Sequence, residues 1–219
     1  MKTLCLFDLD GTLTDSKTGI LNSAEYALKA VGIKTSAYSG NLDKLIGPPI
    51  RDAFRLIHPF TDAEVEEVVR KYREYFATKG LLENEVYPGI MDMLSKLDSQ
   101  GINMAIATSK ATVYAVRIAE HFGFAKYFDV IMGSELDGSR SRKSEVIQAV
   151  LDNLISAEKI IMIGDREHDI IGAKETGVAS VGVTWGYGTR QELEAAGAIN
   201  IVDSAEELYT TILKEIDCA

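Results

Sequence analysis

The chain has 219 residues, 46% hydrophobic and 26% charged, a globular composition that excludes a disordered protein. Its 33 acidic and 23 basic side chains give a formal net charge of -10. This charge argues against a general binder of nucleic acid or anionic membranes, because both surfaces would repel the protein. An anionic small molecule is not excluded, since a metal ion, one lysine and a few backbone N–H groups reverse the local field inside a pocket.

The two cysteines predict no disulfide framework and therefore a reducing compartment. Cys5 lies in an apolar run, where a buried free thiol is expected, and Cys218 near the C-terminus is expected to be exposed. The apolar run at residues 4–7 is too short for a signal peptide. No segment approaches the roughly 18 apolar residues of a membrane span, so we expect a cytoplasmic protein.

Short apolar runs predict strands buried on both faces of a parallel sheet. They cover residues 3–7, 103–107, 130–132, 160–163, 180–183 and, more weakly, 199–202. Segments of helical periodicity lie between the later runs, and the last helix opens with a capping box from Ser204 to Glu207. This alternation predicts an α/β fold with a doubly wound, mostly parallel, Rossmann-like sheet.

The pattern changes between the first and second predicted strands. Residues 15–84 contain no convincing strand and instead carry three amphipathic segments, at about 21–31, 50–57 and 61–76. A connection of this length is far outside ordinary loop lengths. We therefore expect a core domain made of residues 1–14 and 85–219, with residues 15–84 inserted as a helical domain.

The first strand ends in Asp8-Leu9-Asp10-Gly11, where an open α/β sheet places its ligands. The two carboxylates converge if the chain turns at Gly11, and their like charges then require a cation or a proton. Mg²⁺ takes hard oxygen ligands and a protonated carboxyl can donate to a leaving oxygen, so both remedies suit phosphoryl transfer. A lone Asp-X-Asp usually only caps a turn, but the preceding strand and the following Gly-Thr-Leu favour a functional interpretation.

This turn resembles motif I of the haloacid dehalogenase-like hydrolases, and essentially the whole chain follows that family's order of motifs. Thr108-Ser109-Lys110 after the second strand resembles motif II, Lys143 resembles motif III, and Gly164-Asp165 with Asp169 resembles motif IV. The resemblance implies a core of this family with a helical cap formed by residues 15–84. It also implies Mg²⁺ as the cofactor.

Motifs II and III leave alternatives open. A Ser or Thr at a helix start is usually an N-cap, and we expect Thr108 to bind a phosphoryl oxygen and Ser109 to lie nearer to a cap. Lys143 matches the position of the family's lysine, although position alone does not separate it from Arg140 and Arg142. Its neighbour Ser144 replaces the proline of many relatives.

The resemblance implies a mechanism. Asp8 attacks phosphorus and forms an aspartyl-phosphate, and Asp10 protonates the leaving alkoxide and then activates water. Mg²⁺ is held by Asp8, the backbone carbonyl of Asp10, and Asp165, while Thr108 and Lys143 contact the phosphoryl group. We expect Asp169 to orient a metal-bound water or Lys143 without binding the metal directly. The simpler alternative is an acid at a helix N-terminus, where the helix dipole favours it.

The cap resembles that of phosphoglycolate phosphatase-like members, and residues 164–169 resemble bacterial 5′-nucleotidases of the family. Arg51 or Arg55 would then meet a substrate carboxylate. Alternatively Tyr26, Tyr38 or Phe54 would stack on a base. We expect a small phosphate ester as the only partner, with no nucleic acid or membrane. The oligomeric state is left open, and a monomer is plausible because packing within the chain accounts for the apolar faces of the amphipathic helices. The segment Gly186-Tyr187-Gly188 is interpreted as a turn.

Three other functions remain open. A β-phosphoglucomutase-like phosphomutase has the same cap and would release an isomer in place of phosphate. A signalling receiver also uses a phosphorylated aspartate, a hydroxyl and a lysine, but it is roughly half this length and has no cap. A catalytically silent binding protein is disfavoured, because every required side chain is present.

Overall fold

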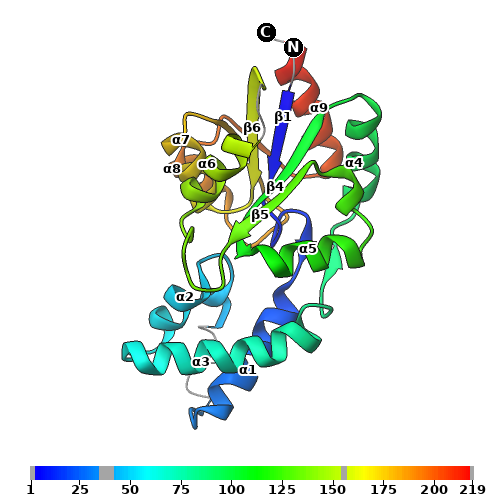
Figure 1. Cartoon of the computed structure of the whole chain (residues 1–219). Helices are drawn as coiled ribbons and strands as arrows, with labels where there is room; N and C mark the ends of the chain where they lie inside the picture. Colours follow the sequence, from blue (N-terminus) through cyan, green and yellow to red (C-terminus); the bar gives the residue numbers. More distant parts are fainter. Residues whose placement is uncertain (1–2, 35–41, 154–156, 218–219) are drawn as a thin grey trace. The chain divides into compact units, whose positions relative to one another are not determined.

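The structure, a computed structural model, describes residues 3–34, 42–153 and 157–217 (Figure 1). Tyr38 and Cys218 lie outside the described residues. The chain divides into two compact units, residues 1–14 with 86–219 and residues 15–85. In the described ranges no helix is both long and apolar enough to cross a bilayer.

The larger unit is built on a parallel sheet of six strands in the order β5-β4-β1-β6-β7-β8. The strands are β1 (Thr3–Phe7), β4 (Asn103–Ala111), β5 (Val130–Ser134), β6 (Lys159–Gly164), β7 (Ala179–Val183) and β8 (Asn200–Val202). All six predicted strands are present, and the predicted doubly wound α/β fold is confirmed.

Helices cover both faces of this sheet (Figure 1). One face carries α4 (Ile90–Ser99), α5 (Thr112–His121) and α9 (Ala205–Asp217), and the other carries α6 (Lys143–Asn153), α7 (Glu167–Glu175) and α8 (Arg190–Ala196). Because the chain leaves the neighbouring strands β1 and β6 toward opposite faces, a crevice is expected between their carboxyl ends. The acids that follow these two strands therefore meet at the switch point of the sheet.

The smaller unit is helical and contains α1 (Lys17–Ala30), α2 (Ile50–Ile57), α3 (Asp62–Tyr75), a 3-10 turn (Leu42–Leu45) and a π turn (Phe76–Gly80). The short strands β2 (Thr14–Asp15) and β3 (Glu85–Val86) pair where the chain passes between the units. The predicted capping box at Thr61 and Glu64 begins α3. Phe54 is fully buried in this unit and packs edge-on against Phe60 and Tyr72.

The structure extends the second predicted strand and adds the helix α8. β4 continues to Ala111, so Ser109 lies inside a strand and the prediction that it caps a helix is wrong. The extension follows from tertiary pairing, since Ala111 aligns with Ser134 of β5 and the Ser134 hydroxyl donates to the Ser109 carbonyl (2.9 Å). The unpredicted helix α8 begins after Thr189, whose hydroxyl accepts the Glu192 N–H.

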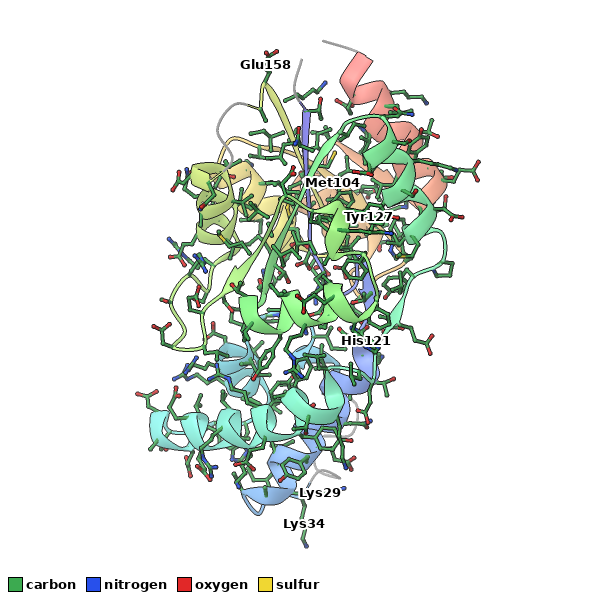
Figure 2. All side chains as sticks on the ribbon, turned by 45° about the vertical axis from the view of Figure 1, so that its right-hand side comes forward. Lys29, Lys34, Met104, His121, Tyr127 and Glu158 are labelled. Atoms are coloured by element: carbon green, nitrogen blue, oxygen red, sulfur yellow. The ribbon has the colours of Figure 1, made fainter. Side chains whose placement is uncertain are left out.

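The core of the larger unit lies between the sheet and its helices. Met104 of β4, labelled in Figure 2, is 1% exposed, and Ile147 of α6 packs with Leu4, Leu6 and Val150 in one buried cluster. Burial of Cys5 raises the pKa of its thiol to about 12, so this cysteine is an inert packing residue, as expected.

We expect Ile147→Ala to lower the free energy of unfolding by about 2–5 kcal/mol, because it removes buried methyl groups and leaves a cavity. Ile171→Ala is the matched control, since Ile171 is 41% exposed on α7 and a surface change of this kind is typically within about 0.5 kcal/mol. Urea unfolding of both variants measures the difference. Equal losses would contradict the assignment of Ile147 to the core.

Candidate active site

The two strand ends at the switch point bring Asp8 and Asp165 together. Asp8 follows β1, and its backbone N–H donates to the Ile163 carbonyl of the adjacent β6 (2.9 Å). Asp165 follows β6 directly, and Asp169 lies in the first turn of α7. Because parallel strands end at the same edge, residues 157 positions apart in sequence share one crevice.

Asp8, Asp165 and Asp169 form a buried acidic cluster with ligand oxygens within 4.8 Å of one another. Burial, together with the charges of Asp169 and Asp8, raises the pKa of Asp165 well above its ordinary value. The pKa of Asp169 is also raised, mainly by burial and against the opposing effect of Lys143. A divalent cation would relieve this repulsion, and the donor set of carboxylate oxygens fits a hard metal ion.

Lys143, the first residue of α6, reaches into the acidic cluster. Its Nζ lies 2.8 Å from Asp8 Oδ1 and 2.7 Å from Asp169 Oδ1, and it donates to the Ala107 carbonyl (3.0 Å). Burial alone would lower the pKa of Lys143, but the carboxylates of Asp169 and Asp8 raise it overall. The amine is therefore a fixed positive charge beside Asp8. A Cβ at Gly172 would lie 2.7 Å from Lys143 Cγ, so glycine lets the lysine stem pass along α7.

The two arginines near Lys143 point to other partners. Arg140 donates to the Gly133 carbonyl (2.8 Å) and forms an ion pair with Glu135. Arg142 forms an exposed ion pair with Glu145 on α6. Of the three cations that the sequence left open, Lys143 is the one that contacts Asp8.

Asp10 lies apart from the three-acid cluster and has a lysine partner that sequence reasoning missed. Lys110 Nζ is 2.8 Å from Asp10 Oδ2, with side chains 7% and 14% exposed. In the described part of the chain, the buried Asp10 Oδ1 has no hydrogen-bond partner. No local signal marks this pair, because Lys110 lies where the register between β4 and β5 shifts, between Ala107 and Ala111.

Thr108 is buried within β4, and its Oγ1 accepts the Lys110 N–H (3.2 Å). Since this bond uses an oxygen lone pair, the hydroxyl proton stays available to donate to an anion. Ser109 has its carbonyl engaged by Ser134, as described above.

Asp165 is held by groups from two turns. The Tyr187 N–H donates to Oδ2 (2.7 Å) and the Thr12 hydroxyl donates to Oδ1 (3.3 Å). Trp185 Nε1 donates to the Thr12 carbonyl (3.0 Å) and so ties the two turns together. Gly11 adopts a φ of +85°, and a Cβ there would lie 2.2 Å from Asp165 Oδ2, which explains the glycine after Asp10. The segment at residues 186–188, interpreted only as a turn, therefore also orients a site acid.

Asp169 has two partners, one for each oxygen. Oδ2 accepts the Arg166 N–H (3.1 Å) at the start of α7, and Oδ1 faces Lys143. A carboxylate in the first helical turn is also favoured by the helix dipole. The two interpretations of Asp169 are therefore compatible, because one oxygen lies at the start of the helix and the other faces Lys143.

The candidate substrate-contacting residues of the smaller unit already have partners there. Arg51 donates two hydrogen bonds to Glu66 (2.6 and 3.0 Å), and Arg55 donates to Asp62 (2.8 Å). Tyr26 packs on Tyr75 at 5.4 Å between ring centroids. Phe54 is 0% exposed, so the prediction that it stacks on a base is wrong, because its ring forms part of this unit's core.

Comparison with known proteins identifies the family. Residues 5–183 match the family described as haloacid dehalogenase-like hydrolase. The chain is 46% identical over 191 residues to a 5′-nucleotidase of Pseudomonas aeruginosa, covering 87% of this chain and 86% of that protein. It is 28% identical over 217 residues to a phosphoglycolate phosphatase of Vibrio parahaemolyticus, covering 95% of each.

A solved structure described as a predicted phosphatase from Clostridium acetobutylicum superimposes with a TM-score of 0.92 at 45% identity, covering 98% of this chain and 99% of that one. The chain belongs to the haloacid dehalogenase-like hydrolases and is an enzyme of that family. The predicted family is confirmed.

We expect Mg²⁺ to raise the melting temperature of the wild-type protein, because binding to the folded state alone stabilises it. Asp165→Asn should lose most of this shift, since it removes a charge from the acidic cluster. Asp98→Asn, the same change on an exposed residue of α4, should keep the shift. Thermal unfolding with and without Mg²⁺ measures all three proteins, and an undiminished shift in Asp165→Asn would contradict the metal site.

Proposed function

We propose that this enzyme is a Mg²⁺-dependent phosphomonoesterase that hydrolyses a small phosphate ester through an aspartyl-phosphate on Asp8. The observation that carries the proposal is the contact of buried Asp8 with Lys143 beside the acids Asp165 and Asp169. A buried carboxylate held by an ammonium group in a site that favours cations suits attack on an anionic phosphoryl group. Mg²⁺, held by Asp8, Asp165 and the Asp10 carbonyl, would supply charge compensation for the phosphoryl oxygens.

The reaction has two steps. In the first, an Asp8 oxygen bonds to phosphorus as the bond to the ester oxygen breaks, and Asp10 gives its proton to the leaving alkoxide. In the second, Asp10 takes a proton from water as the water oxygen bonds to phosphorus and the bond to Asp8 breaks. Thr108 and Lys143 donate to the phosphoryl oxygens in both steps. The phosphoryl group therefore stays in place while it passes from the ester oxygen to Asp8 and then to water.

The substrate class is proposed from the relatives and from the smaller unit. The higher identity to a protein named 5′-nucleotidase supports nucleoside monophosphates ahead of phosphoglycolate, the substrate considered first from sequence. The ion pair from Arg51 to Glu66 also counts against Arg51 as the partner of a substrate carboxylate, because Glu66 already occupies the Nε–Nη2 edge of its guanidinium. Phosphoglycolate remains the second candidate, supported by the relative named for it.

We expect phosphate release from nucleoside monophosphates in the presence of Mg²⁺ and its loss on chelation. A screen should include phosphoglycolate, sugar phosphates and an aryl phosphate, with product analysis to detect an isomerised sugar phosphate. Faster release from nucleoside monophosphates would support the first substrate class, and faster release from phosphoglycolate the second. Absence of Mg²⁺-dependent release from every compound would overturn the proposed function.

Asp8→Asn should reduce kcat by more than about a hundredfold, because an amide oxygen is a poor nucleophile and covalent catalysis is lost. The circular dichroism spectrum should stay unchanged. Asp98→Asn is the control for the amide substitution and should keep wild-type turnover. A variant of Asp8 that retains more than about a hundredth of wild-type kcat would contradict its role as nucleophile.

A further inference from the structure

The contact between Asp10 and Lys110 is one that the roles assigned to the sequence motifs do not predict. Lys110 Nζ approaches Asp10 Oδ2 to 2.8 Å, and both side chains are largely shielded from water. An ion pair at this depth is less screened than a surface pair, so it restricts the carboxylate more strongly. Lys110 is thus placed to fix the orientation of Asp10.

The two oxygens of Asp10 are in different situations. Oδ2 faces the ammonium group of Lys110, whereas Oδ1 is buried and has no hydrogen-bond partner among the described residues. A buried acceptor without a partner costs free energy, so such atoms call for an explanation. A transient partner in the reaction, the leaving oxygen or the attacking water, would supply the missing bond.

The local backbone holds Lys110 where this contact requires it. The Lys110 N–H donates to Thr108 Oγ1 (3.2 Å), and a Cβ at Gly133 of β5 would lie 2.0 Å from the Lys110 carbonyl. The Ser134 hydroxyl fixes the preceding carbonyl of Ser109 (2.9 Å). Lys110 lies where the register between β4 and β5 shifts, its backbone is held by these contacts, and its side chain is only 7% exposed.

The two lysines of the site pair with different acids. Lys143 pairs with Asp8 and Asp169, and Lys110 pairs with Asp10. Because Lys143 already forms an ion pair with Asp8, compensation of the negative charge of Asp8 does not require Lys110. Lys110 instead contacts Asp10, the carboxylate to which the proposed reaction assigns proton transfer.

We propose that Lys110 is the positioning residue of Asp10, holding Oδ2 so that Oδ1 alone exchanges the proton with the leaving oxygen and the water. The proposal rests on the proposed function, since it assigns a role within that reaction. Lys110 acts through Asp10 and does not contact the transferred phosphoryl group. Its loss should therefore affect turnover more than substrate binding.

The test is a double-mutant cycle of Lys110→Met and Asp10→Asn, assayed with an alkyl phosphate and with p-nitrophenyl phosphate. With the alkyl phosphate, Lys110→Met should lower kcat and kcat/KM by about tenfold to a hundredfold at unchanged KM, because part of the proton-transfer contribution is lost. The loss in kcat/KM should be smaller with p-nitrophenyl phosphate, whose leaving group needs little protonation. In the Asp10→Asn background, Lys110→Met should change kcat/KM by less than about threefold.

Lys174→Met is the matched control, since Lys174 is an exposed lysine in the last turn of α7, and it should keep wild-type kinetics. Independent, multiplying losses in the double-mutant cycle would overturn the proposal. So would a raised KM with unchanged kcat, the result expected if Lys110 bound the substrate directly.

A second measurement separates this proposal from the proposed function. Crystal structures of the wild type and of Lys110→Met should show the Asp10 carboxylate in one orientation with the lysine and reoriented without it. An unchanged carboxylate in the variant would overturn the positioning role even if the enzyme hydrolyses phosphate esters. A wild-type protein without phosphatase activity would overturn the proposed function, and with it the proton-transfer role assigned to Oδ1.

Discussion

Repulsion among buried carboxylates is the constraint on which the rest of the site depends. Asp8, Asp165 and Asp169 have oxygens within 4.8 Å of one another, in surroundings where burial already disfavours their charge. With Asp10 the site holds four carboxylates against the ammonium groups of two lysines. If all are ionised, two negative charges remain uncompensated, and one divalent cation would balance them. A site with this imbalance favours a metal ion and, with the ion in place, a phosphoryl group.

The fold supplies the positions that make this imbalance possible. Asp8 and Asp165 follow neighbouring parallel strands whose connections leave toward opposite faces, which leaves a crevice at their carboxyl ends. Lys143 enters from the start of α6, with room for its stem at Gly172 of α7. The backbone N–H of Tyr187, in a separate turn, donates to Asp165. Each group comes from a rigid element or from a turn held by one, which limits the reorganisation needed during reaction.

The sequence predicted much of the fold because its local signals agree with one another. Uniformly apolar runs such as residues 160–163 read as buried strands, and the first predicted cap helix and capping box were found as α1 and Thr61. The errors arose where a distant segment decided local structure. Ser109 reads as a helix cap, yet pairing with β5 extends the strand past it. Phe54 reads equally as a stacking platform or a core residue, and packing against Phe60 and Tyr72 decides for the core.

By itself the sequence determined the order of the motifs, the acids at the ends of two apolar strands and the helical insertion after the first. These features depend on composition and spacing within a few residues, which local sequence records directly. Only the tertiary structure decided that Lys110 pairs with Asp10, that Asp169 shares Lys143 with Asp8, and that the turn at Tyr187 holds Asp165. Those contacts join strands and turns that are far apart in the chain. Strand order and register decide which residues meet, and a short stretch of sequence does not determine either of them.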